Sequence, residues 1–575
     1  MSTEGRFVLA LALMFGVIWG TNKLFPPILP DLEVSADSAS IEGLASPRGD
    51  EASSGADVVT SMSTPQRLGS LTEPSPEEQT QPSRQVSVET PLGNWQFDTR
   101  GAQLSQVRLL RYASLREGDG IVHLLNEGAT ALEKRLVVGN DTLELSQLTF
   151  DVQPAAGLRL TQPGETGELT FVWSTPDSAA QITFVYGFDA DDYLISVRSE
   201  VEGLSRPLLL ESLGSGLAFS EADSAQEAKS MAWVGNHVNE GIDAVELAKV
   251  SEPRLREGPF GWVGVKNKYF LLAVLPGSGA EQAEGAERYL GGVITTPGAE
   301  KGRPSIVVSQ AYDNAGSNRY RIYSGPQEYS RLEALGQDLE EVNPYGWKWL
   351  RPVIRPFVIA TLWVLDFLHD RLSVGYGWVL VIFGVLMRIV LWPLNQKAMR
   401  AQMRNMAVQP MVKEVQAKYK DNPERLQKEM LRLYKEYGFN PLGGCLPMLI
   451  PWPVLIALFF VFQNTIELRG VSFLWLPDLS AKDPIYLLPL FMAVSMFALQ
   501  WISFRSMPDQ GNNPQMKMMM YFMPIFFGFI FMQFPSGLNL YYAVTNIATI
   551  PQQLLIARER KAAAARGPVR VDKSG

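Results

Sequence analysis

The chain has 575 residues, of which 46% are hydrophobic and 19% are charged, and its formal net charge is −9. This length exceeds one ordinary domain. A single cysteine, Cys445, excludes an internal disulfide framework and a thiolate metal cluster, and three dispersed histidines argue against a histidine metal site. We therefore expect neither a metal nor another cofactor.

The net charge conceals an asymmetry along the chain. Residues 26–344 contain 24 Lys and Arg against 46 Asp and Glu, whereas the rest contains 27 basic and 14 acidic residues. An acidic part joined to a basic, apolar part predicts that the two lie in different compartments, not that they are two soluble domains.

The N-terminal residues 1–25 contain an uninterrupted apolar run, Phe7 to Trp19, directly after Arg6. A signal peptide has this pattern, but no small-residue cleavage site follows, so we predict an uncleaved membrane anchor with a cytoplasmic N-terminus. Residues 26–89 are mostly rich in Ser, Pro, Glu, Gln and Gly, which predicts a flexible linker.

Residues 90–344 have the pattern of a large β-sandwich domain. Four segments alternate apolar and polar residues at the period of a strand and are separated by Gly and Asp turns: Asp141–Leu145, Gly167–Trp173, Gln181–Tyr186 and Tyr193–Val197. A polar helix, Glu328–Val342, closes the domain. The segment contains no nucleophile elbow, HExxH motif or phosphate loop, and Asp189, Asp191 and Asp192 lack the EF-hand spacing, so a solvated turn is favoured over a calcium loop.

The C-terminal part is apolar and helical in pattern. Residues 345–370 mix aromatic and basic side chains, which is typical of a helix lying at a membrane interface. Residues 371–394 contain a second span, Tyr376–Leu394. Residues 439–557 contain four more spans: Leu446–Phe462, Ile485–Phe504, Met518–Phe534 and Leu538–Ile556.

Residues 395–438 separate the second and third spans and predict a helical hairpin. Asp421, Asn422 and Pro423 supply the turn, an N-cap and a proline suited to the first turn of the next helix. This loop and the tail, residues 558–575, are both rich in Lys and Arg, so both are expected in the cytoplasm. With six spans the N- and C-termini are then cytoplasmic and the β-domain is periplasmic.

Arg388 is a full positive charge inside the second span. Its insertion costs roughly 2.5 to 3.5 kcal/mol, and it lies close enough to Leu394 that it could simply extend its head to the interface. However, the five C-terminal spans contain no interior Asp or Glu. Because arginine stays protonated, an unpaired Arg388 requires water. We expect a hydrated pocket, with four candidate polar lining residues: Asn464, Thr545, Asn546 and Thr549.

Three features in one order resemble the YidC/Oxa/Alb family of membrane protein insertases: the Arg388 helix with its basic hairpin, Asn440–Cys445, and Phe534–Leu538. The anchor and β-domain resemble the Gram-negative form, which has a periplasmic β-supersandwich. The resemblance implies that Arg388 lies in a hydrophilic groove and that Tyr542, Phe534 and Ile530 contact the nascent chain. Where better-known Gram-negative members have threonine, this chain has Gly384, which predicts a locally wider groove.

The expected fold is a polytopic α-helical membrane protein with six spans, a five-helix insertase core, a large periplasmic all-β sandwich domain and a cytoplasmic helical hairpin. The expected function is insertion of membrane proteins into the bacterial inner membrane, with Arg388 attracting acidic translocated segments and no enzymatic reaction. Expected partners are nascent membrane proteins, the Sec translocon, the ribosome and signal-recognition components, and anionic lipids, with the protein a monomer or part of a larger complex.

Two other functions remain open at this point. The β-domain could drive the assembly of other proteins, with the membrane part as its anchor. A secondary transporter would need internal repeats and paired ionisable groups, and neither is evident in the sequence. An intramembrane protease is disfavoured further, because its motifs are missing.

Overall fold

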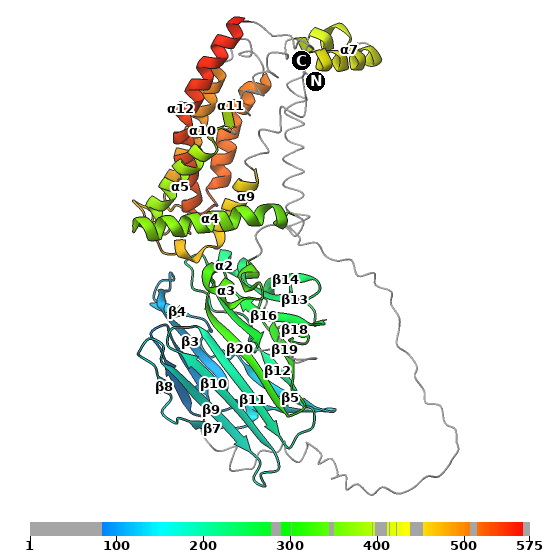
Figure 1. Ribbon diagram of the computed structural model, residues 1–575, viewed down its shortest axis with the longest axis vertical. Helices are drawn as coiled ribbons and strands as arrows, with labels where there is room; N and C mark the ends of the chain where they lie inside the picture. The colour runs from blue at the N-terminus through cyan, green and yellow to red at the C-terminus, as the bar shows by residue number, and fades with distance from the viewer. Residues whose placement is uncertain are drawn as a thin grey trace, which may run out of the picture. The chain divides into compact units, whose positions relative to one another are not determined.

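Three β-sheets form the N-terminal half of the described chain (Figure 1). The computed structural model describes residues 83–277, 289–300, 302–343, 350–393, 395–396, 411–412, 414–420, 422–436, 452–505 and 514–566. The predicted anchor, most of the predicted linker, the Asn440–Cys445 motif and residues 567–575 of the tail lie outside these ranges.

The largest sheet has nine strands and the other two have five and six. In sheet order, the nine-stranded sheet contains β14 (Gly241–Glu246), β13 (Ala232–His237), β16 (Phe260–Lys266), β17 (Phe270–Pro276), β20 (Ser317–Pro326), β11 (Leu194–Glu202), β10 (Gln181–Asp189), β9 (Thr166–Ser174) and β7 (Asp151–Gln153). The five-stranded sheet contains β4 (Ile121–His123), β3 (Gln103–Ala113), β2 (Gly93–Asp98), β1 (Gln85–Glu89) and β8 (Leu158–Arg159). The six-stranded sheet contains β15 (Arg254–Arg256), β18 (Val293–Thr296), β19 (Ser305–Ala311), β12 (Leu208–Ser212), β5 (Glu133–Val138) and β6 (Asp141–Glu144).

The nine-stranded sheet packs against both smaller sheets. Trp95 of β2 donates its indole N–H to the Ser324 hydroxyl of β20 at 2.7 Å. Four residues earlier on the same face of β20, the Tyr320 hydroxyl donates to Glu211 of β12 at 3.0 Å. The two smaller sheets therefore cover one large sheet, and the predicted β-sandwich is confirmed.

The four predicted strands are present as β6, β9, β10 and β11. In β11 buried and exposed residues alternate along the strand, as expected where one face meets the core. By contrast, β16 and β17 are buried at every position. One contact that covers β16 comes from Gln337, whose carbonyl accepts the Trp262 indole N–H at 2.9 Å.

The closing helix differs from the prediction of one continuous helix over Glu328–Val342. The structure has α3 (Tyr329–Leu335) and a separate 3-10 helix, η6 (Leu339–Val342). Three consecutive residues between them, 336–338, have positive φ angles of 75°, 58° and 56°. Gly336 adopts this conformation without steric cost and ends α3, so the chain cannot continue as one helix.

The three clustered aspartates form a hydrogen-bonded turn, as the missing EF-hand spacing indicated. Asp189 accepts the Asp191 backbone N–H at 2.8 Å, Asp191 accepts the Gly164 N–H at 2.7 Å, and Asp192 pairs with Arg331 at 3.4 Å. The carboxylates therefore stabilise local structure. Among the described residues there is no group of three or more His, Cys, Asp or Glu that could hold a metal ion.

The C-terminal half consists of helices. Short helices of the β-domain include α2 (Ser224–Ser230), and the helices that follow it are α4 (Arg351–Leu372), α5 (Tyr376–Val390), α7 (Pro423–Glu436), α9 (Trp452–Asn464), α10 (Leu487–Arg505), α11 (Pro514–Phe531) and α12 (Ser536–Arg566). Four of them, α5, α9, α10 and α11, overlap the corresponding predicted apolar segments. The last helix, α12, covers the predicted Leu538–Ile556 and continues ten residues beyond it.

Many large apolar side chains of these helices are exposed. Ile389 of α5 is 63% exposed and Ile525 of α11 is 72% exposed. Such a surface is typical of helices that face lipid. Among the described residues, α4 is the one helix long and apolar enough to cross a membrane by itself, while four shorter apolar stretches lie in α5, α9, α10 and α11.

The predicted hairpin is described in part. Asn422 accepts the backbone N–H of Arg425 at 3.1 Å and α7 begins at Pro423, so the predicted cap and first-turn proline are both present. Residues 414–418 are also helical. Much of residues 395–438 lies outside the described ranges, so the packing of the two helices stays a prediction.

Candidate functional site

Arg388 lies in the last turn of α5 and is half-buried. Its Nη2 donates to the Oε1 of Gln552 on α12 at 2.7 Å, and its Nε is buried without a hydrogen-bond partner. Within the part of the chain that the structure describes, no Asp or Glu oxygen lies within the 4.0 Å of an ion pair with Arg388. Among the described side chains, the partner of Arg388 is thus a neutral amide.

Gln552 was not among the site residues expected from the sequence. It is 2% exposed, and its Nε2 donates to the backbone carbonyl of Trp392, just after α5, at 3.2 Å. One amide thus connects the Arg388 side chain and the end of α5 to α12. The sequence signal was a polar residue in an apolar helix, but Thr545, Asn546 and Thr549 carried the same signal.

Gly384 lies one turn before Arg388, where α5 packs against α12. A Cβ placed on Gly384 would meet Val544 Cγ1 at 3.1 Å and Tyr541 Cδ2 at 3.6 Å. The expectation of a locally wider groove at Gly384 is therefore wrong. Side chains of α12 occupy the space that a larger residue at position 384 would need. The glycine permits this contact because the backbone of α5 can lie directly against those side chains.

Aromatic side chains form a row from α12 to α11. Tyr542 lies edge-on to Phe531 with 5.0 Å between ring centroids, and Phe531 lies 5.0 Å from Phe534. Ile530 directly precedes Phe531 and packs against the same hydrophobic core. The structure therefore packs Tyr542, Phe534 and Ile530 against one hydrophobic core. On α12, Tyr542 lies about three turns before Gln552, the partner of Arg388.

The remaining candidate polar residues do not converge on Arg388. Asn546 donates to the Ser495 hydroxyl of α10 at 3.0 Å, so its side chain faces a different helix. Thr545 and Thr549 donate to the carbonyls of Tyr541 and Thr545 in their own helix, at 2.5 and 2.6 Å. Asn464 is the last residue of α9. Among the described residues, Gln552 is the side chain that hydrogen-bonds Arg388, and the lining of a pocket by Asn546, Thr545 and Thr549 stays a prediction.

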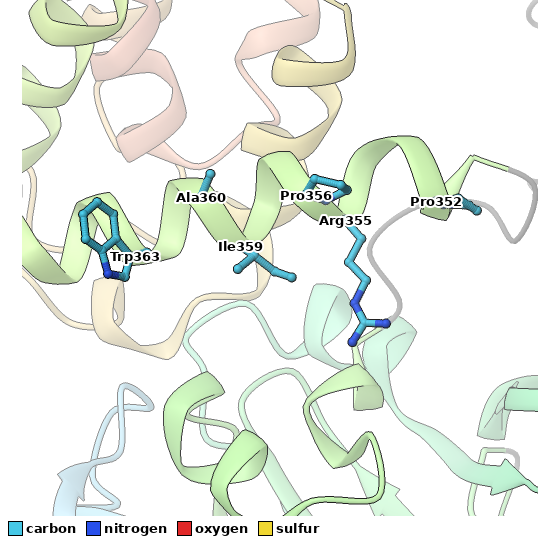
Figure 2. A pocket seen from close by; sticks show the side chains of 6 residues that line it. All are labelled: Pro352, Arg355, Pro356, Ile359, Ala360 and Trp363. Atoms are coloured by element: carbon cyan, nitrogen blue, oxygen red, sulfur yellow. The ribbon is translucent and has the colours of Figure 1, made fainter.

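A second feature lies on α4, which packs against α5 and α9 (Figure 1). This helix carries a largely apolar pocket of about 460 Å³. Figure 2 shows the six side chains that line it: Pro352, Arg355, Pro356, Ile359, Ala360 and Trp363. Arg355 extends from the same side of the helix as Ile359 and pairs with Glu341 at 2.7 Å and Glu340 at 3.3 Å. The charge of Arg355 is thus paired with carboxylates of the β-domain. The other five residues that line the pocket are apolar.

Comparison with known proteins accounts for both halves of the chain. Residues 85–359 match the family model of the YidC periplasmic domain, and residues 367–563 match that of the 60Kd inner membrane protein. The two models divide the described chain near the boundary between the β-domain and the helices, within α4.

Whole-chain relatives give the same result. The membrane protein insertase YidC of Chlorobaculum parvum is 32% identical over 519 residues, which cover 84% of each chain. The membrane protein insertase YidC of Syntrophus aciditrophicus is 29% identical over 547 residues. The match covers 93% of this chain and 95% of the relative. A crystal structure of an active YidC insertase, with its first transmembrane domain resolved, covers 83% of this chain at 19% identity and a TM-score of 0.32. The chain belongs to the YidC family of membrane protein insertases, inner-membrane proteins with a periplasmic domain.

Proposed function

We propose that this insertase moves substrates along a hydrophilic groove beside Arg388, open to the cytoplasm and to lipid and closed towards the periplasm. The observation that carries the proposal is the pairing of Arg388 with a neutral amide alone among the described residues, with its Nε unpaired. A charge in this state requires water or an incoming anion. Arg388 would attract acidic residues in the short segment of a substrate that is to be translocated.

The distribution of polar residues on α12 supports a hydrated cytoplasmic half. Its first turns carry the aromatic pair Tyr541 and Tyr542, whereas residues 545–553 carry threonine, asparagine and glutamine side chains. Gln553 of α12 accepts the Ser503 hydroxyl of α10 at 3.2 Å. A polar segment that enters this region crosses less hydrocarbon, and the apolar span then gains about 0.8 kcal/mol for each CH₂ that leaves water.

The aromatic row provides a path from the groove to lipid. Tyr542 and Phe534 are both partly buried, so each retains exposed surface that a passing apolar segment could contact. Their partner Phe531 is buried and holds the two rings in place. Tyr542, Phe534 and Ile530 would guide the span and require no nucleotide.

The proposed topology has six spans, with both termini and the basic hairpin in the cytoplasm. The basic hairpin and tail suit acidic surfaces such as ribosomal RNA, signal-recognition components and anionic lipid, and insertion beside the Sec translocon is part of the same proposal. No chemical reaction is part of it. Helix α4 would lie along the periplasmic interface. Its apolar side includes Trp363, which is 64% exposed, while Arg355 points to the β-domain.

Site-specific photo-cross-linking tests the path. A cross-linking amino acid would replace Tyr542 or Ile547 in the full-length protein, and a ribosome-stalled single-span substrate would be presented to both. Ile547 is a matched control, because it lies on α12 five residues away and is 46% exposed on the outer surface. We expect strong cross-linking at position 542 and weak cross-linking at 547, whereas equal or reversed yields would contradict the path.

Deletion of residues 90–325 distinguishes the groove from the alternative, an assembly factor that acts through its β-domain. The groove residues lie outside the deleted segment, so the truncated protein should still insert a small single-span substrate. Loss of insertion at unchanged protein abundance would favour the β-domain.

A further inference from the structure

Gln552 makes two hydrogen bonds, one to the guanidinium of Arg388 and one to the backbone just after α5. Its Oε1 accepts Arg388 Nη2 at 2.7 Å, and its Nε2 donates to the Trp392 carbonyl at 3.2 Å. The side chain is 2% exposed, so water does not compete with either bond. Such a residue fixes the direction of its partner.

The orientation of the amide follows from these two partners. The Trp392 carbonyl can only accept and the guanidinium can only donate, so the amide nitrogen must face Trp392 and the amide oxygen must face Arg388. The Trp392 carbonyl lies two residues after the end of α5 at Val390, in a short helical stretch that continues from it. Both ends of the amide are therefore used, and no rotated arrangement satisfies both partners.

The chemical nature of the acceptor determines how much charge remains. A carboxylate at position 552 would pair with the guanidinium and cancel its charge, whereas the neutral amide satisfies one N–H group and leaves the full positive charge. The buried, unpaired Nε shows that Gln552 does not satisfy every donor of the guanidinium. A neutral acceptor is what a site needs if it must both orient and preserve a charge.

We propose that Gln552 is a positioning residue that aims Arg388 at the translocated segment and keeps its charge available, so that it sets the preference for acidic tails. This inference rests on the proposed role of Arg388 in attracting such tails. Gln552 acts through Arg388 and makes no contact with substrate in this proposal.

The test measures insertion rates for two single-span substrates that differ only in their translocated tail, one acidic and one neutral. Purified full-length variants would be reconstituted into liposomes of neutral lipid. Gln552→Glu should reduce the acidic-to-neutral rate ratio by about fivefold to tenfold, because one unit charge at close range is cancelled. Gln552→Met removes the hydrogen bonds but keeps the charge, so it should slow insertion of the acidic tail less and preserve a ratio above one.

Gln553→Glu is the matched control. Gln553 is the adjacent residue of the same helix, but its Oε1 accepts a hydrogen bond from Ser503 of α10, so the new carboxylate would face away from Arg388. The rate ratio of this variant should remain that of the wild type. An equal loss of the ratio at 552 and 553 would overturn the inference, because any added negative charge would then suffice.

Arg388→Ala separates failure of this inference from failure of the proposed function. If Arg388→Ala leaves the ratio unchanged, the attraction of acidic tails is wrong. If Arg388→Ala lowers the ratio and Gln552→Glu does not, only the role of Gln552 is wrong. Should Gln552→Glu fail to accumulate, Gln552→Met decides: an acidic-to-neutral ratio below that of the wild type but above one supports the inference. Equal slowing of both tails, which leaves the ratio at the wild-type value, indicates a structural role and overturns it.

Discussion

Arg469 and Glu221 form a buried ion pair between the loop that joins α9 to α10 and the β-domain, with 2.6 Å between Nε and Oε1. Their side chains are only 4% and 9% exposed. Arg469 also donates to the carbonyls of Ala113 at 2.8 Å and Ser220 at 3.2 Å. One side chain thus joins two regions that are matched by separate family models.

Removal of Arg469 should loosen this junction. Arg469→Ala leaves Glu221 buried without its charge partner, which costs about 3 to 5 kcal/mol. Lys482→Ala is the control at the same junction, because the Lys482–Asp223 pair at 3.0 Å is exposed and contributes about 0 to 1 kcal/mol. Limited proteolysis of the purified protein should cut between the two regions much faster in Arg469→Ala alone. Equal protection of both variants would contradict the importance of the buried pair.

The position of Gly384 predicts a steric effect that a second substitution can relieve. Gly384→Thr places a side chain against Val544, with its Cβ 3.1 Å from Val544 Cγ1, and should cost about 1 to 3 kcal/mol by overpacking. Adding Val544→Ala should restore part of the loss. Thermal unfolding in detergent and insertion activity would measure both variants. If Gly384→Thr is fully stable and active alone, the close approach of α5 and α12 is wrong.

The buried carboxyl of Glu227 predicts a pH dependence of stability. Burial raises its pKa to about 7, although Ser220 and Glu221 backbone N–H groups donate to it. Between pH 4.5 and 7 the native state therefore holds a proton that the unfolded chain releases. The free energy of unfolding should fall with rising pH across this window, by up to about 3 kcal/mol, and level off above pH 7.

Replacing Glu227 by Gln should flatten that slope. Urea unfolding of the purified protein between pH 5 and 8, followed by tryptophan fluorescence, would compare wild type, Glu227→Gln and the exposed control Glu117→Gln. The contribution of Glu227 is the difference between the first two slopes. An unchanged slope in Glu227→Gln would show that this carboxyl does not titrate as described.

Lys134 and Glu211 form a second buried pair, at 3.7 Å inside the sandwich with both side chains fully buried. Lys134→Met alone should destabilise the β-domain by about 3 to 5 kcal/mol, because it leaves Glu211 unpaired. The double variant Lys134→Met/Glu211→Gln keeps an acceptor for Tyr320 and should be much closer to wild type. Chemical denaturation of all three variants measures the coupling, and additive losses would contradict it.

The sequence was sufficient for features that depend on neighbouring residues. Strand alternation located β9, β10 and β11, and the order Asn422–Pro423 located the start of α7. The unusual charge at Arg388 was also visible, because a single arginine in an apolar segment has a known cost. These signals act over a few residues, so no knowledge of packing was needed.

Features that depend on how helices face one another could not be predicted in the same way. Thr545, Asn546, Thr549 and Gln552 are all polar residues of one helix, and the way in which α12 packs against α5 decides which of them hydrogen-bonds Arg388. Arg469 and Glu221 are 248 residues apart, so no local pattern relates them. The break after α3 was missed because two non-glycine residues there also adopt positive φ angles.

The central claim is that the charge of Arg388 promotes insertion. The most direct measurement is insertion of a small single-span substrate with an acidic translocated tail into liposomes that contain only the purified protein and no nucleotide, scored by protease protection. We predict that wild type and Arg388→Lys protect the tail, because both keep the positive charge. Arg388→Ala should insert the substrate more slowly by about tenfold, which corresponds to a loss of about 1.4 kcal/mol of interaction with the acidic tail. Normal protection of the acidic tail by Arg388→Ala would contradict the account.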